Sequence, residues 1–214
     1  MKKLYSNQNG RSMIEMLGVL AIVGILSVGG IAGFSKAMMK LKLNKLADEY
    51  HLFLREFLML GNEWKRLQNQ VSPEVSINLA SYMPSIGIIP HTWEVKNDYI
   101  YDSMGNRFRP FVYQNNQQLA FDVFLKSADN AYDNKELCFY FLQNIALHYH
   151  DAVLQVWVYK GKSGGNVLPV FRGDAYCRST SQKCLREATP SDFLQVCSGC
   201  SEKDICVIAF HIPI

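Results

Sequence analysis

The sequence predicts an α+β fold, in which one long N-terminal helix packs on a mostly antiparallel β-sheet. Three observations lead to this expectation: an uncharged apolar run near the N-terminus, a helical apolar stripe that continues from it, and later segments rich in β-branched and aromatic residues. The 214 residues are enough for one ordinary domain plus an extension. A formal net charge of +3 indicates no strongly basic surface, so we expect no nucleic-acid partner.

The apolar run extends from Met16 to Phe34 and contains no charged residue. At about 1.5 Å per residue, a helix of this length spans roughly 28 Å, close to the thickness of a bilayer core. A secretory signal has a shorter apolar region, of about 7–15 residues, followed by a small-residue cleavage site. We therefore expect a transmembrane helix over about 13–34. A simple membrane anchor is the alternative.

Glu15 lies at the N-terminal edge of this run. A carboxylate deep in a membrane costs roughly 2.5 kcal/mol or more, so such a residue is a functional candidate. The run itself offers no basic partner for it. A newly exposed α-amino group shortly upstream is well suited to pair with this carboxylate.

The segment Gly10-Arg11-Ser12-Met13-Ile14-Glu15-Met16-Leu17, followed by the apolar run, resembles the type IV prepilin signature. The resemblance implies that a prepilin peptidase cuts between Gly10 and Arg11, which makes residues 1–10 a leader peptide. It also implies that Glu15, fifth in the mature chain, pairs with the N-terminal amine of a neighbouring subunit during assembly. Mature family members usually begin with Phe or Met, commonly N-methylated. Arg11 departs from this pattern, and the sequence does not predict whether it is methylated.

Beyond the run, ten apolar residues follow at alternating steps of four and three, which predicts one apolar helix face. They are Met39, Leu43, Leu46, Tyr50, Phe53, Phe57, Leu60, Trp64, Leu67 and Val71. The charged residues between them suit a solvated or subunit-facing side. These are Asp48, Glu49, Arg55, Glu56, Lys65 and Arg66.

Ser72-Pro73 is a clear helix breaker, so we expect one helix from about residue 12 to about residue 70. Its aromatic second half suits packing under a sheet. Its first half is apolar all round, so it needs either lipid or equivalent helices around it. The glycines of that half allow close helix approach, which favours self-assembly into a helical filament. They are Gly18, Gly24, Gly29, Gly30 and Gly33.

The predicted organisation is a leader over 1–10, a long helix over 11–71 and a globular domain over 72–214. Pro- and Ser-rich residues 75–97 indicate a loop. Strands are expected at Asp98–Tyr101, Phe108–Tyr113, Leu119–Phe124, Ala152–Tyr159 and Ile205–Ile212. A turn is expected at Ser103–Asn106. A helix is expected between Asp133 and about Leu147, with Leu137, Phe141, Leu142 and Ile145 on one side.

The segment Gly87-Ile88-Ile89-Pro90-His91-Thr92-Trp93, with Gly105 and Cys138 downstream, is similar to type IVb pilins and conjugative-pilus relatives. This second resemblance is looser than the first and covers the middle of the chain. It implies a Gly–Pro–Trp loop, a turn with glycine, and a bridged cysteine on a short helix.

The six cysteines are confined to the second half of the chain, which indicates a disulfide framework in an oxidising compartment. They are Cys138, Cys177, Cys184, Cys197, Cys200 and Cys206. Six cysteines permit fifteen pairings, and sequence cannot choose among them. We expect Cys138 to pair with one of the last three, and Cys177 with Cys184 to close a small loop. A zinc site in this cluster, and a redox-active Cys197-Ser198-Gly199-Cys200 pair, are the alternatives.

Two further motifs are weaker. His148-Tyr149-His150-Asp151 resembles half a metal site but has no second ligand cluster, and Gly161-Lys162-Ser163-Gly164-Gly165 lacks the full phosphate-loop pattern. We expect surface residues in the first case and an exposed loop in the second. No catalytic arrangement stands out, so we expect no metal, no cofactor and no enzymatic activity.

The expectation for function is a structural subunit of a type IV pilus (a fimbrium) or of a type II secretion pseudopilus. Its partners would be copies of itself, the prepilin peptidase, inner-membrane lipid before assembly, and the assembly platform of the bacterial inner membrane. The precursor would span that membrane once, and the mature chain would enter a periplasmic pseudopilus or a cell-surface pilus. The alternative is a membrane-anchored periplasmic binding or redox domain that never polymerises. The sequence does not distinguish pilus from pseudopilus, or major from minor subunit, and it does not predict an adhesion target.

Overall fold

The computed structural model describes residues 13–71, 76–113, 118–125, 133–160, 170–178, 183–200 and 206–214. The chain divides into two compact units, Met1–Leu43 and Asn44–Ile214. The first unit, as far as it is described, is helical throughout. The second combines helices with a sheet, so the fold class is α+β, as the sequence predicts.

Helix α1 extends over Met13–Met59 and is followed by α2 over Gly61–Val71. The sequence predicts one uninterrupted helix to about residue 70, and this is wrong at Leu60. The carbonyl of Phe57 would accept from the Gly61 amide in an uninterrupted helix, but the indole Nε1 of Trp64 donates to it instead, at 3.0 Å. Gly61 itself has a low helix propensity.

The other helices of the described chain are short. They are α3 Met83–Ile86, α4 Asn134–Asn144, α5 Pro190–Cys197, and the 3₁₀ turns η2 Ala146–Tyr149, η3 Asp174–Tyr176 and η4 Leu185–Glu187. Asp133 caps α4 by accepting from the amide of Lys135. Thr189 and Asp192 form a capping box at the start of α5.

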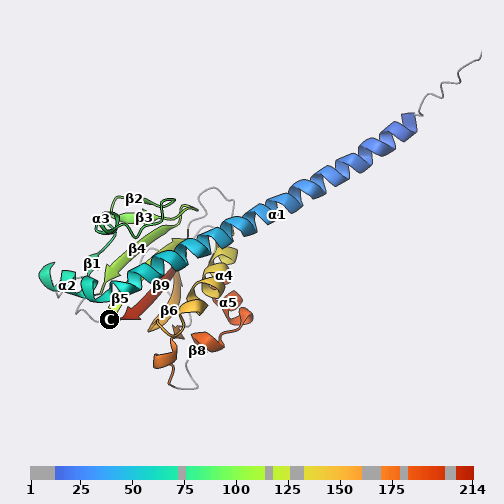
Figure 1. The fold of residues 1–214 in the computed structure, drawn as a ribbon. Helices are drawn as coiled ribbons and strands as arrows, with labels where there is room; N and C mark the ends of the chain where they lie inside the picture. The colour runs from blue at the N-terminus through green and yellow to red at the C-terminus, as the bar shows by residue number, and fades with distance from the viewer. Residues whose placement is uncertain are drawn as a thin grey trace, which may run out of the picture. The chain divides into compact units, whose positions relative to one another are not determined.

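Nine strands of the described residues form one sheet, in the order β2-β3-β4-β5-β9-β6-β7-β8, with β1 paired to β4. They are β1 Ile77–Asn78, β2 Glu94–Lys96, β3 Tyr99–Tyr101, β4 Arg107–Val112, β5 Gln118–Leu125, β6 Gln155–Lys160, β7 Phe171–Arg172, β8 Lys183–Cys184 and β9 Cys206–Pro213. The pairing of β7 with β8 is parallel, and the others are antiparallel. In Figure 1, the C-terminal strand β9 lies between β5 and β6, in the middle of the sheet.

The core of the second unit lies between the sheet and the second half of α1 (Figure 1). Tyr50, Phe53 and Phe57 are fully buried there. The ring of Phe53 meets that of Phe108 on β4 edge-on, with centroids 5.0 Å apart. The ring of Phe57 meets that of Phe121 on β5 at 6.4 Å. The aromatic half of the stripe therefore packs under the sheet, as the sequence predicts.

All five expected strands and the expected second helix are present, with ends shifted by a few residues. The four apolar residues expected on one side of α4 and just after it, Leu137, Phe141, Leu142 and Ile145, are buried. The segment expected as a loop over 75–97 contains β1, α3 and β2 instead. These elements are two to four residues long. Segments this short show no recognisable hydrophobic periodicity in the sequence.

Replacing Phe53 by alanine should lower the free energy of unfolding of the second unit by about 3–5 kcal/mol, because it leaves a cavity in a fully buried ring cluster. Urea unfolding of the full chain in detergent, followed by near-ultraviolet circular dichroism, measures this loss. The matched control is Leu52→Ala on the exposed side of the same helix turn, expected to change stability by less than about 0.5 kcal/mol. Equal effects of the two substitutions would contradict the packing of this helix face.

Candidate functional site

The first candidate is the N-terminal part of α1. The expected cleavage residues Gly10 and Arg11 lie outside the described residues. Glu15 lies exposed in the first turn of the helix, where the partial positive charge of the helix N-terminus favours a carboxylate. The structure thus places the expected assembly carboxylate at the end of the apolar rod.

Every large apolar side chain of α1 from Met13 to Phe34 is more than half exposed within the described chain, in the range of 52% at Val23 to 82% at Met13. The hydroxyl of Ser27, the one polar side chain in the uncharged run, donates to the carbonyl of Val23 at 2.7 Å. By length and composition alone, α1 qualifies as a membrane-crossing helix. This surface is compatible with an apolar environment, since the uncharged run presents no charged side chain.

The second candidate is a buried carboxylate on the other half of α1. Glu49 accepts hydrogen bonds from Thr92 Oγ1 at 2.8 Å, Trp93 Nε1 at 3.0 Å and Ser103 Oγ at 2.5 Å. The ammonium of Lys45 lies 3.9 Å away. Burial alone would raise the pKa of this carboxyl, but the three hydrogen bonds outweigh it and the pKa is lowered. Glu49 therefore ties α1 to two separate loops of the domain.

The expectation that Glu49 lies on a solvated or subunit-facing side is wrong, since it is buried. The spacing of the apolar stripe cannot reveal this burial, because Glu49 immediately precedes the stripe residue Tyr50 and is not itself a stripe position. Its donors come from segments more than forty residues downstream. Asp48 and Arg55 are exposed, as the helical pattern predicts.

Asp102, between β3 and β4, forms the second buried anchor, and its contact on α1 is Tyr50, the residue after Glu49. Its carboxylate accepts from the hydroxyl of Tyr50 at 3.1 Å, and from the Met104 amide, the Asn106 amide and the Asn106 side chain, each at 2.9 Å. Burial raises the pKa of Asp102 to about 6, although these hydrogen bonds oppose the rise. The same carboxylate closes the expected turn between β3 and β4, in which Gly105 has a φ of +82°.

The loop that ends at Trp93 delivers this side chain to the Glu49 anchor. Gly87 ends α3 with a φ of +72°, a conformation that side chains other than glycine rarely adopt. The indole of Trp93 is 93% buried, with its ring 4.7 Å from Tyr50 and 5.3 Å from Phe53. The loop thus serves, in this structure, to seat the domain on α1.

Three disulfides join all six cysteines: Cys138–Cys197, Cys177–Cys184 and Cys200–Cys206. The first confirms the expectation that Cys138 pairs with one of the last three cysteines, and it connects α4 to the end of α5. The second confirms the expected small loop. Cys197 and Cys200 are bonded to other partners, so the alternative of a redox-active CxxC pair does not match this pairing.

The sulfur atoms of Cys138, Cys200 and Cys206 lie within 4.8 Å of one another, and no solvent reaches these residues. Cys197 is bonded to the first of them and is also buried. Thiolates, not disulfide sulfurs, bind metal ions, so this four-cysteine cluster as bonded here offers no thiolate ligand.

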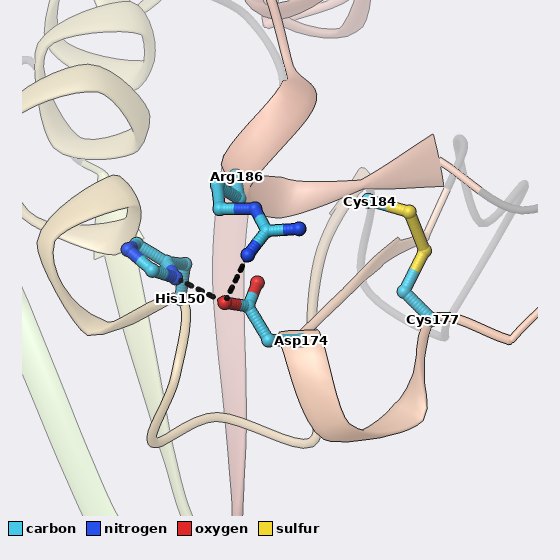
Figure 2. The surroundings of a disulfide bond; sticks show 5 residues. All are labelled: His150, Asp174, Cys177, Cys184 and Arg186. Carbon is cyan, nitrogen blue, oxygen red and sulfur yellow. Dashed lines mark hydrogen bonds and ion pairs between the residues drawn. A yellow bond between two sulfur atoms is a disulfide. The ribbon is translucent and has the colours of Figure 1, made fainter.

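The Cys177–Cys184 bond lies beside a small charged group (Figure 2). The Oδ2 atom of Asp174, on η3, lies 2.9 Å from His150 Nδ1. It also accepts a hydrogen bond from the guanidinium of Arg186 at 3.4 Å. This bond and this group hold the segment that contains β7, η3, β8 and η4. Unlike the four-cysteine cluster, both cysteines are half-buried.

The motif His148-Tyr149-His150-Asp151 is split by the structure. The ring of His148 faces that of His51 on α1 at 5.0 Å, and the Tyr149 hydroxyl donates to the His51 carbonyl at 3.2 Å. His150 turns instead toward Asp174. The glycine-rich motif at 161–165 lies outside the described residues.

Two features therefore qualify as functional within the described chain: the exposed apolar rod that begins at Glu15, and the disulfide-bonded domain anchored on the rest of α1. No protein-family model, curated protein or solved structure matches this chain.

Asp102→Asn should flatten the dependence of stability on pH between about 4 and 6. The pKa of Asp102 is about 6 in the folded chain against 3.8 as its ordinary value, so the folded chain binds this proton more tightly. The free energy of unfolding therefore falls as pH rises through that window, by about 3 kcal/mol from this group. Urea unfolding at a series of pH values measures the free energy of unfolding of the variant and of the wild type. Glu49 is present in both, so its contribution cancels in the difference between them.

Asp48→Asn is the control, because this carboxylate is exposed on the same helix. It should leave the pH profile unchanged. Parallel profiles for wild type and Asp102→Asn would show that Asp102 does not titrate in the folded chain as described.

Proposed function

We propose that this chain is a structural subunit of a type IV pilus or of a related type II secretion pseudopilus. In this proposal the chain is made as a prepilin, cut by a prepilin peptidase between Gly10 and Arg11, and polymerised through the N-terminal half of α1. The observation that carries the proposal is the exposed, uncharged helix surface from Met16 to Phe34, headed by Glu15.

The energetics of that surface permit extraction from lipid only if neighbouring helices replace the lipid, since exposure to water would be costly. Burying apolar surface stabilises by about 25 cal/mol per Å², and equivalent helices supply an apolar environment as a bilayer does. Five glycines of this helix have open space where a side chain would begin: a methyl group added there would meet no atom of the described chain within 4 Å. They are Gly18, Gly24, Gly29, Gly30 and Gly33. These positions therefore leave room for the backbone of a neighbouring helix.

Glu15 gives the packing its register. A carboxylate among apolar helices is favourable only when an opposite charge is placed against it, and the α-amino group of Arg11 of a neighbouring subunit is such a charge once the leader is removed. A helix displaced along its axis loses this pair, so the pair selects one axial position. In this proposal the same carboxylate makes assembly depend on cleavage.

The disulfide-bonded domain supports an exported location. Crosslinks of this kind form and persist in oxidising compartments such as the bacterial periplasm. A cell-surface or periplasmic filament exposes its subunits to that environment. A membrane-anchored periplasmic domain that never polymerises would share this property, so the tests below address assembly and processing.

In cells that contain a prepilin peptidase, the mature chain should begin at Arg11. Intact-mass measurement of the purified chain should give the mass lacking residues 1–10, with or without one methyl group. A Gly10→Val variant should keep the leader, because it removes the glycine that precedes the cut in the prepilin signature. A wild-type chain that keeps its leader in such cells would contradict the processing step.

Glu15→Gln should abolish filaments while leaving the second unit folded, because it removes the negative charge that pairs with the neighbouring amine. The measurement is the amount of chain in sheared surface fractions, together with negative-stain imaging. Glu15→Asp, which keeps the charge on a shorter side chain, should retain partial assembly.

The matched control is Glu56→Gln, which neutralises a carboxylate on the part of α1 that belongs to the second unit. It should assemble as wild type. Disulfide mapping reports whether each variant is folded. Wild-type chain that is processed, folded and still monomeric in the membrane would support the anchored, non-polymerising alternative instead.

A further inference from the structure

The pairing of the six cysteines does not follow their order in the chain. In order, they are Cys138, Cys177, Cys184, Cys197, Cys200 and Cys206. The structure bonds the first to the fourth and the second to the third, so the Cys177–Cys184 bond is nested within the Cys138–Cys197 bond. Cys200–Cys206 joins the fifth to the sixth. A chain that bonded each cysteine to the next would therefore obtain one native bond out of three.

The order in which the cysteines reach an oxidant decides which bond forms first. When a chain crosses a membrane from its N-terminus, Cys138 is exposed together with Cys177 before Cys197 arrives. Once Cys184 is exposed, loop-closure entropy favours the native Cys177–Cys184 bond, which spans 7 residues. Its advantage over the longer Cys138–Cys177 loop is about 1.5 kcal/mol, at about 0.6 kcal/mol per doubling of loop length. The native partner of Cys138 is 59 residues away, beyond both nearer cysteines. Exposure in chain order thus makes consecutive pairing, Cys138–Cys177 with Cys184–Cys197, a competing first product.

The folded structure cannot correct such an error. Cys138, Cys197, Cys200 and Cys206 are at most 1% exposed, so no external thiolate reaches the finished cluster. Cys177 and Cys184 remain half-buried beside the charged group of His150 and Asp174 (Figure 2). Exchange at the four buried cysteines must therefore occur before the core closes.

We propose that folding of this chain requires a dithiol thiol–disulfide isomerase as a partner, and that the nested Cys177–Cys184 bond is the cause of this requirement. The inference rests on the exported location in the proposed function. It does not depend on polymerisation.

The exchange is balanced without any net oxidation. A thiolate of the isomerase attacks the Cys177 sulfur of the Cys138–Cys177 bond, which forms a mixed disulfide and releases the thiolate of Cys138. That thiolate attacks Cys197 in the Cys184–Cys197 bond, which forms the native Cys138–Cys197 bond and releases the thiolate of Cys184. Cys184 then attacks Cys177, which forms the native Cys177–Cys184 bond and returns the isomerase thiolate.

The geometry of the cluster explains why the exchange ends at the native pairing. The sulfurs of Cys200 and Cys206 lie within 4.8 Å of Cys138, so a Cys138 thiolate in the forming core has disulfide sulfurs within short reach. Attack on Cys200–Cys206 is reversible while the core is open. Packing of α4 on α5 then buries the Cys138–Cys197 bond and removes it from exchange.

The experiment is to express the full chain in bacteria that contain the periplasmic disulfide oxidase, with and without the periplasmic dithiol isomerase. Free thiols are blocked at harvest, and the bonds are mapped by mass spectrometry of non-reduced peptides. The fraction of wild-type chain with the Cys138–Cys197 bond should fall severalfold without the isomerase, with Cys138–Cys177 appearing in its place.

Two double variants separate nesting from cysteine number. In Cys177→Ser/Cys184→Ser, the four remaining cysteines give the native bonds when joined in order, so native pairing should no longer depend on the isomerase. Cys200→Ser/Cys206→Ser removes the same number of cysteines and keeps the nested arrangement, so the dependence should persist. For both variants the measurement is the pattern of disulfide bonds, which can be mapped even if a variant folds poorly.

Native pairing of the wild-type chain without the isomerase would overturn the proposal, as would equal isomerase dependence of the two variants. A chain whose six cysteines are all reduced in the cell would overturn both this inference and the exported location. A correctly bonded chain that needs the isomerase but forms no filaments would overturn only the assembly function.

Discussion

Burial of Tyr50, Phe53 and Phe57 between α1 and the sheet is the interaction around which the second unit is organised. These three rings contact side chains of β4, β5, α4 and the Trp93 loop, so the segments that follow α1 are positioned against one helix face. Each ring, when fully buried, contributes several times the thermal energy through area alone. The strands are arranged so that the central ones, β5 and β9, lie across that face.

Two carboxylates next to these rings determine where along the helix the domain sits. Apolar packing is tolerant of small displacements, whereas a buried carboxylate that loses its donors is strongly destabilised. Glu49 has side-chain donors from two loops, and Asp102 accepts from Tyr50 on the helix. The domain can therefore occupy one axial position on α1. In the proposed filament, Glu15 would play the same part for the other half of the helix, between subunits instead of within one.

The disulfides stabilise the region where the sheet and its aromatic core contribute least. Strands β7 and β8 have two residues each and lie at the sheet edge, and α5 is only eight residues long. Such short elements bury little area, so crosslinks that restrict the unfolded chain supply much of their order. Nesting one bond inside another crosslinks the region doubly, and it is also what makes the pairing order of the chain differ from the native pairing.

The sequence by itself determined the features that depend on local pattern. The apolar run after Glu15, the aromatic stripe to Phe57, the five longer strands and the helix around Cys138 all follow from hydrophobic periods, which are properties of contiguous residues. The tertiary structure alone decided the break at Leu60, where an indole from Trp64 takes a helix carbonyl, and the burial of Glu49, whose donors lie far along the chain. It also decided which of Cys197, Cys200 and Cys206 bonds to Cys138. These outcomes depend on which individual groups the fold brings into contact, because hydrogen bonds and disulfides require a contact geometry that hydrophobic spacing does not encode.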